Sequence, residues 1–126
     1  MVSIAAILFA VFAGIVILFQ MGLVIGMPWG EYAMGGRFPG IYPWKMRIAS
    51  MVQMIIQLLF AFVVLVRAEI ILSDYFRMSV TAIWFVVGFL VLATVLNLIT
   101  PSKKERAIWA PISILMLISS LIVALS

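Results

Sequence analysis

Four long apolar stretches, separated by short polar segments, follow one another along almost the whole chain. A helix that crosses about 30 Å of hydrocarbon needs about 20 mostly apolar residues, and each stretch comes close to this length or exceeds it. The pattern therefore predicts an all-α integral membrane protein with one transmembrane domain over residues 1–126, in which four helices form an antiparallel bundle. The predicted spans are Ile4 to Met27, Ile48 to Val66, Ser79 to Ile99 and Ile108 to Leu125.

The composition agrees with this pattern. Of the 126 residues, 67% are hydrophobic, and the mean hydropathy is +1.37, whereas soluble domains are about half apolar. The chain has no Cys and no His, which excludes disulfides, thiolate nucleophiles, imidazole bases and the usual zinc and haem ligands. We therefore expect no cofactor, no metal site and no enzymatic activity.

The first apolar stretch differs from a secretory signal peptide. No basic segment precedes it, and it is longer than the apolar core of such peptides, which is about 7 to 15 residues. We expect this stretch to remain in the mature protein as the first membrane helix.

Basic residues are distributed unequally over the connecting loops. The first and third loops together contain six Lys and Arg residues, whereas the second loop contains Arg67 and Arg77. Short loops rich in Lys and Arg stay in the cytoplasm. We therefore expect residues 28–47 and 100–107 to be cytoplasmic and both chain ends to lie outside, in a bacterial inner (plasma) membrane.

The positive charge indicates contact with lipids rather than with nucleic acid. The isoelectric point near 10.0 comes from basic residues spread over three loops, without the contiguous basic face of a nucleic-acid-binding protein. Anionic lipid head groups attract basic residues beside membrane spans. The residues expected to contact head groups are Lys45, Arg47, Lys103, Lys104 and Arg106.

Uncharged polar residues gather in one half of the predicted bundle. Gln53 and Gln57 lie one turn apart on one face of the second span. Gln20 and Asn97 lie near the ends of the first and third spans, at the same side of the membrane. No charged residue lies well inside a span, so the embedded carboxylate of a proton-coupled exporter is missing and Glu31, in the first loop, is the nearest candidate.

Two interpretations of this polar layer remain open. Either the amides hydrogen-bond between helices and fix their register, or they line a water-accessible vestibule, closed by the first loop, that holds a small polar or amphipathic ligand. In the second interpretation the candidate ligand contacts are Gln20, Glu31, Arg37, Gln53, Gln57 and Asn97.

The first loop, residues 28–47, contains four glycines, three prolines and five aromatic residues. It is too long for a minimal helical hairpin and too aromatic for a flexible linker. We expect it to be ordered and inserted at the membrane interface, with re-entry into the membrane as an open alternative. Glu31 is expected to pair with Arg37 or Arg47.

Glycine and proline pairs predict two turns within this loop. Gly35-Gly36 permits a sharp reversal, and Pro39-Gly40 is typical of a type II turn.

A different glycine pattern, with small residues at every fourth position, begins in the first span and favours close packing, either inside this chain or against a second copy. These residues are Ala6, Ala10, Gly14, Gly22, Gly26 and Gly30.

The last span has its own start pattern. Ser102 with Glu105 three residues later is typical of a capping box, so a helical turn should begin at Lys103. Pro111 lies too late for a first-turn position, and we expect a kink or break between Ala107 and Pro111.

Two segments, GMPWGEYAMGG in the first loop and TPSKKERAIWAP before the last span, resemble uncharacterised small four-helix membrane proteins of Gram-positive bacteria. The resemblance covers most of the chain, implies no named activity and transfers no functional residue.

Taken together, these patterns favour a non-enzymatic accessory or interaction subunit. Its expected partners are the lipid bilayer and either another membrane protein or a second copy of the chain, and nucleic acid is excluded. The alternative is a minimal dimeric transporter or channel for a small polar or amphipathic solute.

Overall fold

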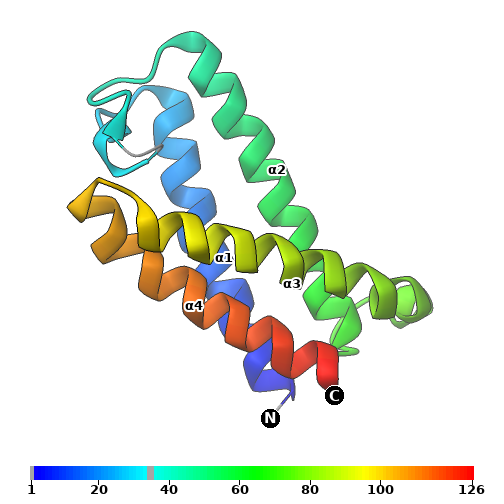
Figure 1. Cartoon of the computed structure of the whole chain (residues 1–126). Helices are drawn as coiled ribbons and strands as arrows, with labels where there is room; N and C mark the ends of the chain where they lie inside the picture. The colour runs from blue at the N-terminus through cyan, green and yellow to red at the C-terminus, as the bar shows by residue number, and fades with distance from the viewer. Residues whose placement is uncertain (1, 34–35) are drawn as a thin grey trace.

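The computed structural model describes residues 2–33 and 36–126, and these residues form helices and no strand (Figure 1). Each of the four long helices is long and apolar enough to span a membrane. Two short 3-10 turns, η1 (Gly30–Tyr32) and η3 (Ser73–Tyr75), lie in the connections. The long helices are α1 (Val2–Ile25), α2 (Trp44–Arg67), α3 (Phe76–Ile99) and α4 (Lys103–Leu125). The predicted fold class is confirmed, and the helices fit a small multi-pass membrane protein.

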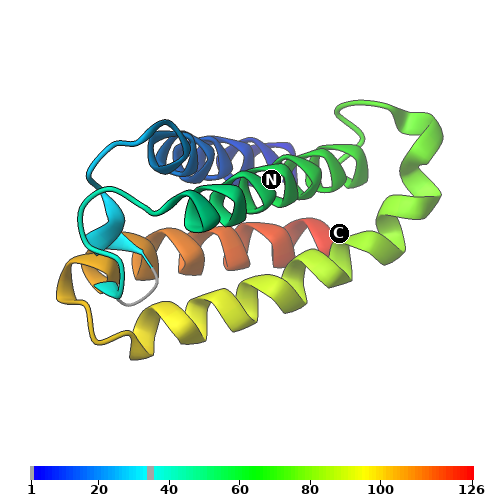
Figure 2. The same cartoon turned by 90° about the horizontal axis from the view of Figure 1, so that it is seen from above.

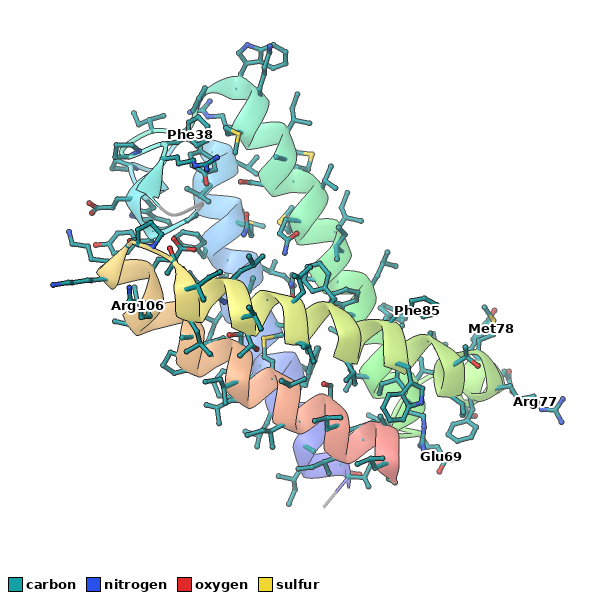
Figure 3. The ribbon with its side chains drawn as sticks, viewed as in Figure 1. Phe38, Glu69, Arg77, Met78, Phe85 and Arg106 are labelled. Carbon is teal, nitrogen blue, oxygen red and sulfur yellow. The ribbon has the colours of Figure 1, made fainter. Side chains whose placement is uncertain are left out.

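The helices form two antiparallel hairpins, α1 with α2 and α3 with α4, and α1 also packs against α4. Figures 1 and 2 show both chain ends and the connection around η3 at one end of the bundle. From this end α2 and α3 diverge, and the hairpins are farthest apart where the first loop lies. Figure 3 places the labelled Glu69 and Arg77 at the first end and Arg106 at the other, so charged side chains lie at both ends.

The half of the bundle near the chain ends, the closed half, has an apolar core from all four helices. Small residues of α1 let the neighbouring helices approach closely, since association in lipid depends on packing. The fully buried side chains include Phe9, Val64, Ile83, Met116 and Val123, and Ala6 and Ala13 are buried among them. The closed half therefore holds the two hairpins together.

The start of α2 differs from the prediction. The helix begins at Trp44, four residues before the predicted Ile48. Pro43 adopts extended backbone geometry at the N-cap position, and its carbonyl accepts hydrogen bonds from the amides of Met46 and Arg47. Proline is compatible with a helix start because the first helical positions have no intrahelical acceptor for their amides. The residues expected to end the loop form the first turn of α2 instead.

The capping prediction for α4 is confirmed, because the Ser102 hydroxyl accepts a 3.2 Å hydrogen bond from the Glu105 amide. Of the kink or break predicted between Ala107 and Pro111, the break is wrong, since α4 continues through Pro111, and the kink stays a prediction. Pro111 has no amide hydrogen to donate to the Ala107 carbonyl, four residues earlier, yet the helix continues on both sides of it. The nearby Ser113 hydroxyl donates to a different carbonyl, that of Trp109, at 2.8 Å.

Candidate functional site

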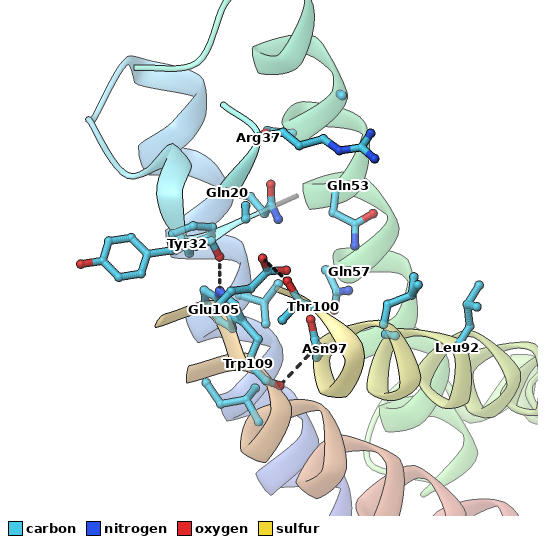
Figure 4. Close-up of a pocket in the computed structure, with 18 of the residues that line it drawn as sticks. Gln20, Tyr32, Arg37, Gln53, Gln57, Leu92, Asn97, Thr100, Glu105 and Trp109 are labelled. Carbon is cyan, nitrogen blue, oxygen red and sulfur yellow. Dashed lines mark hydrogen bonds between the residues drawn. The ribbon is translucent and has the colours of Figure 1, made fainter. Parts of the chain in front are cut away.

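A cavity of about 770 Å³ lies in the diverging half of the bundle, between the four helices and the first loop (Figure 4). We call this half the open half. Five of the six candidate contacts predicted from the sequence line the cavity, and the aromatic side chains of Phe19, Tyr32, Tyr42, Phe89 and Trp109 form much of its wall. The polar lining residues are Gln20, Arg37, Ser50, Gln53, Gln57, Asn97, Thr100 and Glu105.

One face of α2 supplies the deepest polar groups. Ser50, Gln53 and Gln57 follow one another at spacings of three and four, which places them on the same side of a helix. Gln57 lies about 20 Å along α2 from its start, at a rise of about 1.5 Å per residue. Its side chain is buried, with 4% exposure, and its Oε1 atom has no hydrogen-bond donor among the described residues. A buried acceptor without a donor is uncommon and calls for an explanation.

Asn97 behaves differently from Gln57. Its Nδ2 atom donates to the Ser113 hydroxyl at 3.2 Å and to the carbonyl of Trp109 at 3.4 Å, so this amide ties α3 to α4. The register interpretation therefore describes Asn97 well, although its side chain also lines the cavity.

Glu105, Ser50 and Thr100 are polar residues of the cavity wall that the sequence pattern does not predict as ligand contacts. The sequence predicts a capping role for Glu105 in α4 and indicates Glu31 as the carboxylate nearest the polar layer. The structure instead places Glu105 in the cavity wall, 8% exposed, where one carboxylate oxygen accepts a 3.1 Å hydrogen bond from the Thr100 hydroxyl. The spacing of Glu105, Trp109 and Ile112 on one face of α4 is the pattern that predicts this position.

Tyr42, at the end of the first loop, brings a phenol into the wall beside this carboxylate. Its side chain is 4% exposed. Burial raises the pKa of Tyr42 above its ordinary value of 10.0, and the negative charge of Glu105 raises it further. Both effects disfavour a tyrosinate, so the phenol stays protonated and can donate a hydrogen bond into the cavity.

Several contacts fix the described part of the first loop to the start of α4. The indole Nε1 of Trp109 donates to the Tyr32 carbonyl at 2.7 Å, and the Ser102 hydroxyl donates to the Glu31 carbonyl at 3.2 Å. Lys104 forms an ion pair of 3.3 Å with the Glu31 carboxylate, and its ammonium lies over the Tyr32 ring, 5.7 Å from the ring centroid. The loop therefore closes the cavity on the α1 and α4 side, which agrees with an ordered loop.

The expected pairing of Glu31 with Arg37 or Arg47 is wrong. The turn η1 folds onto α4, and the Glu31 carboxylate pairs with Lys104 instead. Glu31 is also the one candidate contact that does not line the cavity. Arg37 does line it, from the loop side, as Figure 4 shows. The guanidinium of Arg47 packs against Gly26 at the end of α1.

Glycines let the loop return closely onto α1 and onto itself. A Cβ atom at Gly22 would collide with the Trp29 ring, and one at Gly30 would collide with the Phe38 carbonyl. The Gly30 amide donates to the Gly40 carbonyl at 2.8 Å. Of the small residues predicted to favour close packing, Gly22 and Gly30 thus serve contacts within this chain. A Cβ at Gly14 would meet no atom within 4 Å.

The turn predictions have different outcomes. Gly40 adopts a φ of +79°, the left-handed geometry expected for the third residue of a type II turn after Pro39. Gly36 also has a positive φ of +77°. Gly35, the other half of the predicted reversal, lies outside the described residues.

Of the residues expected to contact head groups, four are exposed at the loop end of the bundle, and Arg47 is half-buried. Arg106 donates to the Thr100 carbonyl at 2.7 Å, which stabilises the turn between α3 and α4. Head-group contact stays a prediction for Lys45, Arg47, Lys103, Lys104 and Arg106.

Within residues 2–33 and 36–126, no group of three or more acidic side chains is placed to hold a metal ion. No protein-family model, curated protein or solved structure shows significant similarity to this chain. The resemblance to small four-helix proteins of Gram-positive bacteria stays a prediction.

Proposed function

We propose that this protein is a non-enzymatic membrane protein that binds a small polar or amphipathic molecule in the cavity of its open half. The observation that carries the proposal is that candidate side chains from several parts of the chain meet at one cavity. Candidate side chains from α1, the first loop, α2 and α3 line one cavity, of a volume typical for small-molecule sites, which is about 300 to 1,000 Å³. In that cavity Gln57 also contributes an acceptor to which none of residues 2–33 and 36–126 donates.

Binding is favoured over conduction because the cavity is blind. Most of its lining residues lie in the open half, and at its inner end it borders the apolar core, to which Leu90 belongs together with buried side chains such as Phe9 and Ile83. Transport by a dimer would need a second arrangement in which the packed half opens. If the predicted orientation holds, the cavity belongs to the cytoplasmic half of the membrane.

Mass spectrometry of small molecules that remain bound after gentle purification tests the proposal. We expect the wild-type protein to retain a ligand and the Gln53→Leu/Gln57→Leu double variant to lose it while remaining folded. Thr94→Val is the matched control. It removes a buried α3 hydroxyl that has no hydrogen-bond partner in the described part of the chain, and Thr94 does not line the cavity. Equal retention by the double variant, or no bound molecule in the wild type, would contradict the proposal.

The second candidate is the accessory role, supported by a shallow hollow on the outer face of α3. Val80, Thr81, Trp84 and Phe85 line it, and Phe85 is 75% exposed (Figure 3). Large aromatic side chains are enriched where proteins contact one another. A photo-crosslinking residue at Phe85 should capture one defined membrane protein in cells, and the same residue at Leu98 should not; equal capture at both sites contradicts this role.

A further inference from the structure

The cavity has a mouth in the side of the bundle, between α2 and α3. Residues that both line a cavity and are exposed on the outer surface mark its opening. Leu92, Leu96 and Ile99 of α3 do both, with exposures of 57%, 52% and 69%. Ala49 on α2 is likewise exposed and lines the cavity. These two helices are the ones that diverge toward the first loop in Figures 1 and 2.

With the four helices placed across a bilayer, the exposed leucines put this mouth against the hydrocarbon region. From Leu92 to Ile99 it extends about 10 Å along α3, at a rise of about 1.5 Å per residue. Its rim on α3 is apolar. On the other side, the first loop is hydrogen-bonded to α4 through Trp109 and Ser102. A molecule that enters through the mouth therefore comes from the bilayer, and its apolar part contacts Leu92 and Leu96.

The polar lining favours a neutral head group with hydroxyls. Amide and hydroxyl side chains such as Gln53, Gln57 and Ser50 both donate and accept hydrogen bonds, as hydroxyl groups do. Among the described residues no group donates to Gln57 Oε1, so a hydroxyl of the ligand can do so. Glu105 lies in the same wall, where its carboxylate already accepts a hydrogen bond from the Thr100 hydroxyl. Arg37 at the loop side and Glu105 contribute one positive and one negative group to the lining, so these two charges balance and do not favour an anionic head group over a neutral one.

We infer that the ligand is a membrane lipid with a neutral, hydroxyl-bearing head group, such as a glycosyl diacylglycerol, which enters sideways between α2 and α3. The head group lies between Gln57 and Glu105, and the acyl chains remain along Leu92 and Leu96. This inference rests on the proposed function, since it names the ligand class of the same cavity.

Competition between lipids tests the inference. The protein is purified in a detergent without a sugar head group and placed in phosphatidylcholine nanodiscs that contain equal amounts of glucosyl diacylglycerol and phosphatidylglycerol. Native mass spectrometry then measures which lipid the released protein retains. We expect about tenfold preference for the glucosyl lipid, and methyl glucoside in the water should not displace it. Equal retention of the two lipids, or displacement by methyl glucoside, overturns the inference.

Paired variants locate the bound lipid. Gln57→Leu should lower retention of the glucosyl lipid about tenfold, the effect of one lost hydrogen bond in a buried site. Leu96→Trp should lower it by blocking the mouth, whereas Leu98→Trp, two residues away and not in the lining, should leave it unchanged. Unchanged retention in both Gln57→Leu and Leu96→Trp overturns the inference.

A variant that removes a charge, Glu105→Gln, tests the lipid specificity independently of whether Gln57→Leu folds. Glu105→Gln should raise retention of phosphatidylglycerol, because it removes the negative charge that disfavours an anionic head group; no increase contradicts the assigned neutral specificity. Different results would refute the proposed function and the lipid inference. A water-soluble molecule lost from the Gln53→Leu/Gln57→Leu variant would support the proposed function and refute the lipid, whereas a protein that binds no molecule of either kind refutes both.

Discussion

The two halves of this bundle are built from the same four helices and have opposite interiors. In the closed half, Ala6 and Ala13 of α1 are buried in one apolar core together with Phe9, Val64 and Met116. In the open half the same hairpins separate around a cavity, whose wall combines aromatic side chains with amides, hydroxyls, Arg37 and Glu105. In a membrane, helices associate through packing and hydrogen bonds rather than through exclusion of water. The closed half can therefore supply the stability that the open half lacks.

This comparison predicts that the two halves respond differently to substitution. The largest effect is expected for Phe9→Ala, because Phe9 has no exposed surface and its truncation leaves a cavity. We expect the free energy of unfolding to fall by about 3 kcal/mol, measured by denaturant unfolding in detergent micelles. The matched change in the open half, Gln57→Leu, should leave stability unchanged or higher, since it removes a buried acceptor without a donor. A similar fall in the free energy of unfolding for both variants would contradict the difference between the two halves.

An intermediate effect is expected in the loop that covers the open half. Gly30→Ala places a Cβ against the Phe38 carbonyl, and crowding of this kind costs about 1 to 3 kcal/mol. We expect faster amide hydrogen exchange in the loop while the closed half keeps its protection. Gly14→Ala is the control: it has open space and should stabilise α1 by up to about 1 kcal/mol. Equal exchange in the two variants would show that the loop does not depend on this close approach.

The smallest effect concerns Tyr42 and appears only in alkaline solution. Because the pKa of Tyr42 is raised in the folded protein by burial and by Glu105, the unfolded chain loses the phenolic proton first. The stability that Tyr42 provides is thus complete below its ordinary pKa of 10.0 and declines as the pH rises through the raised value. Unfolding of the wild type and Tyr42→Phe, compared across this range, should show the difference shrinking with pH. A constant difference would place Tyr42 outside the buried wall.

Different parts of the site were predictable to different extents. The spans and the half that holds Gln20, Gln53 and Gln57 follow from local patterns, because hydropathy and helical spacing depend on neighbouring residues alone. The partner of Glu31 did not follow. Lys104 lies 73 positions away, and only the fold of the loop onto α4 selects it over the nearer Arg37 and Arg47.

By itself, the sequence determined four membrane-spanning helices, their antiparallel order, the cap at Ser102 and a polar half. Only the tertiary structure decided that the hairpins diverge in that half (Figure 1), that Glu105 lies in the cavity wall, and that exposed residues of α3 line the same cavity. The physical reason is the range of the interactions. Hydropathy and capping act within a helix, whereas the angle between hairpins depends on how Phe9 and its neighbours pack at the opposite end.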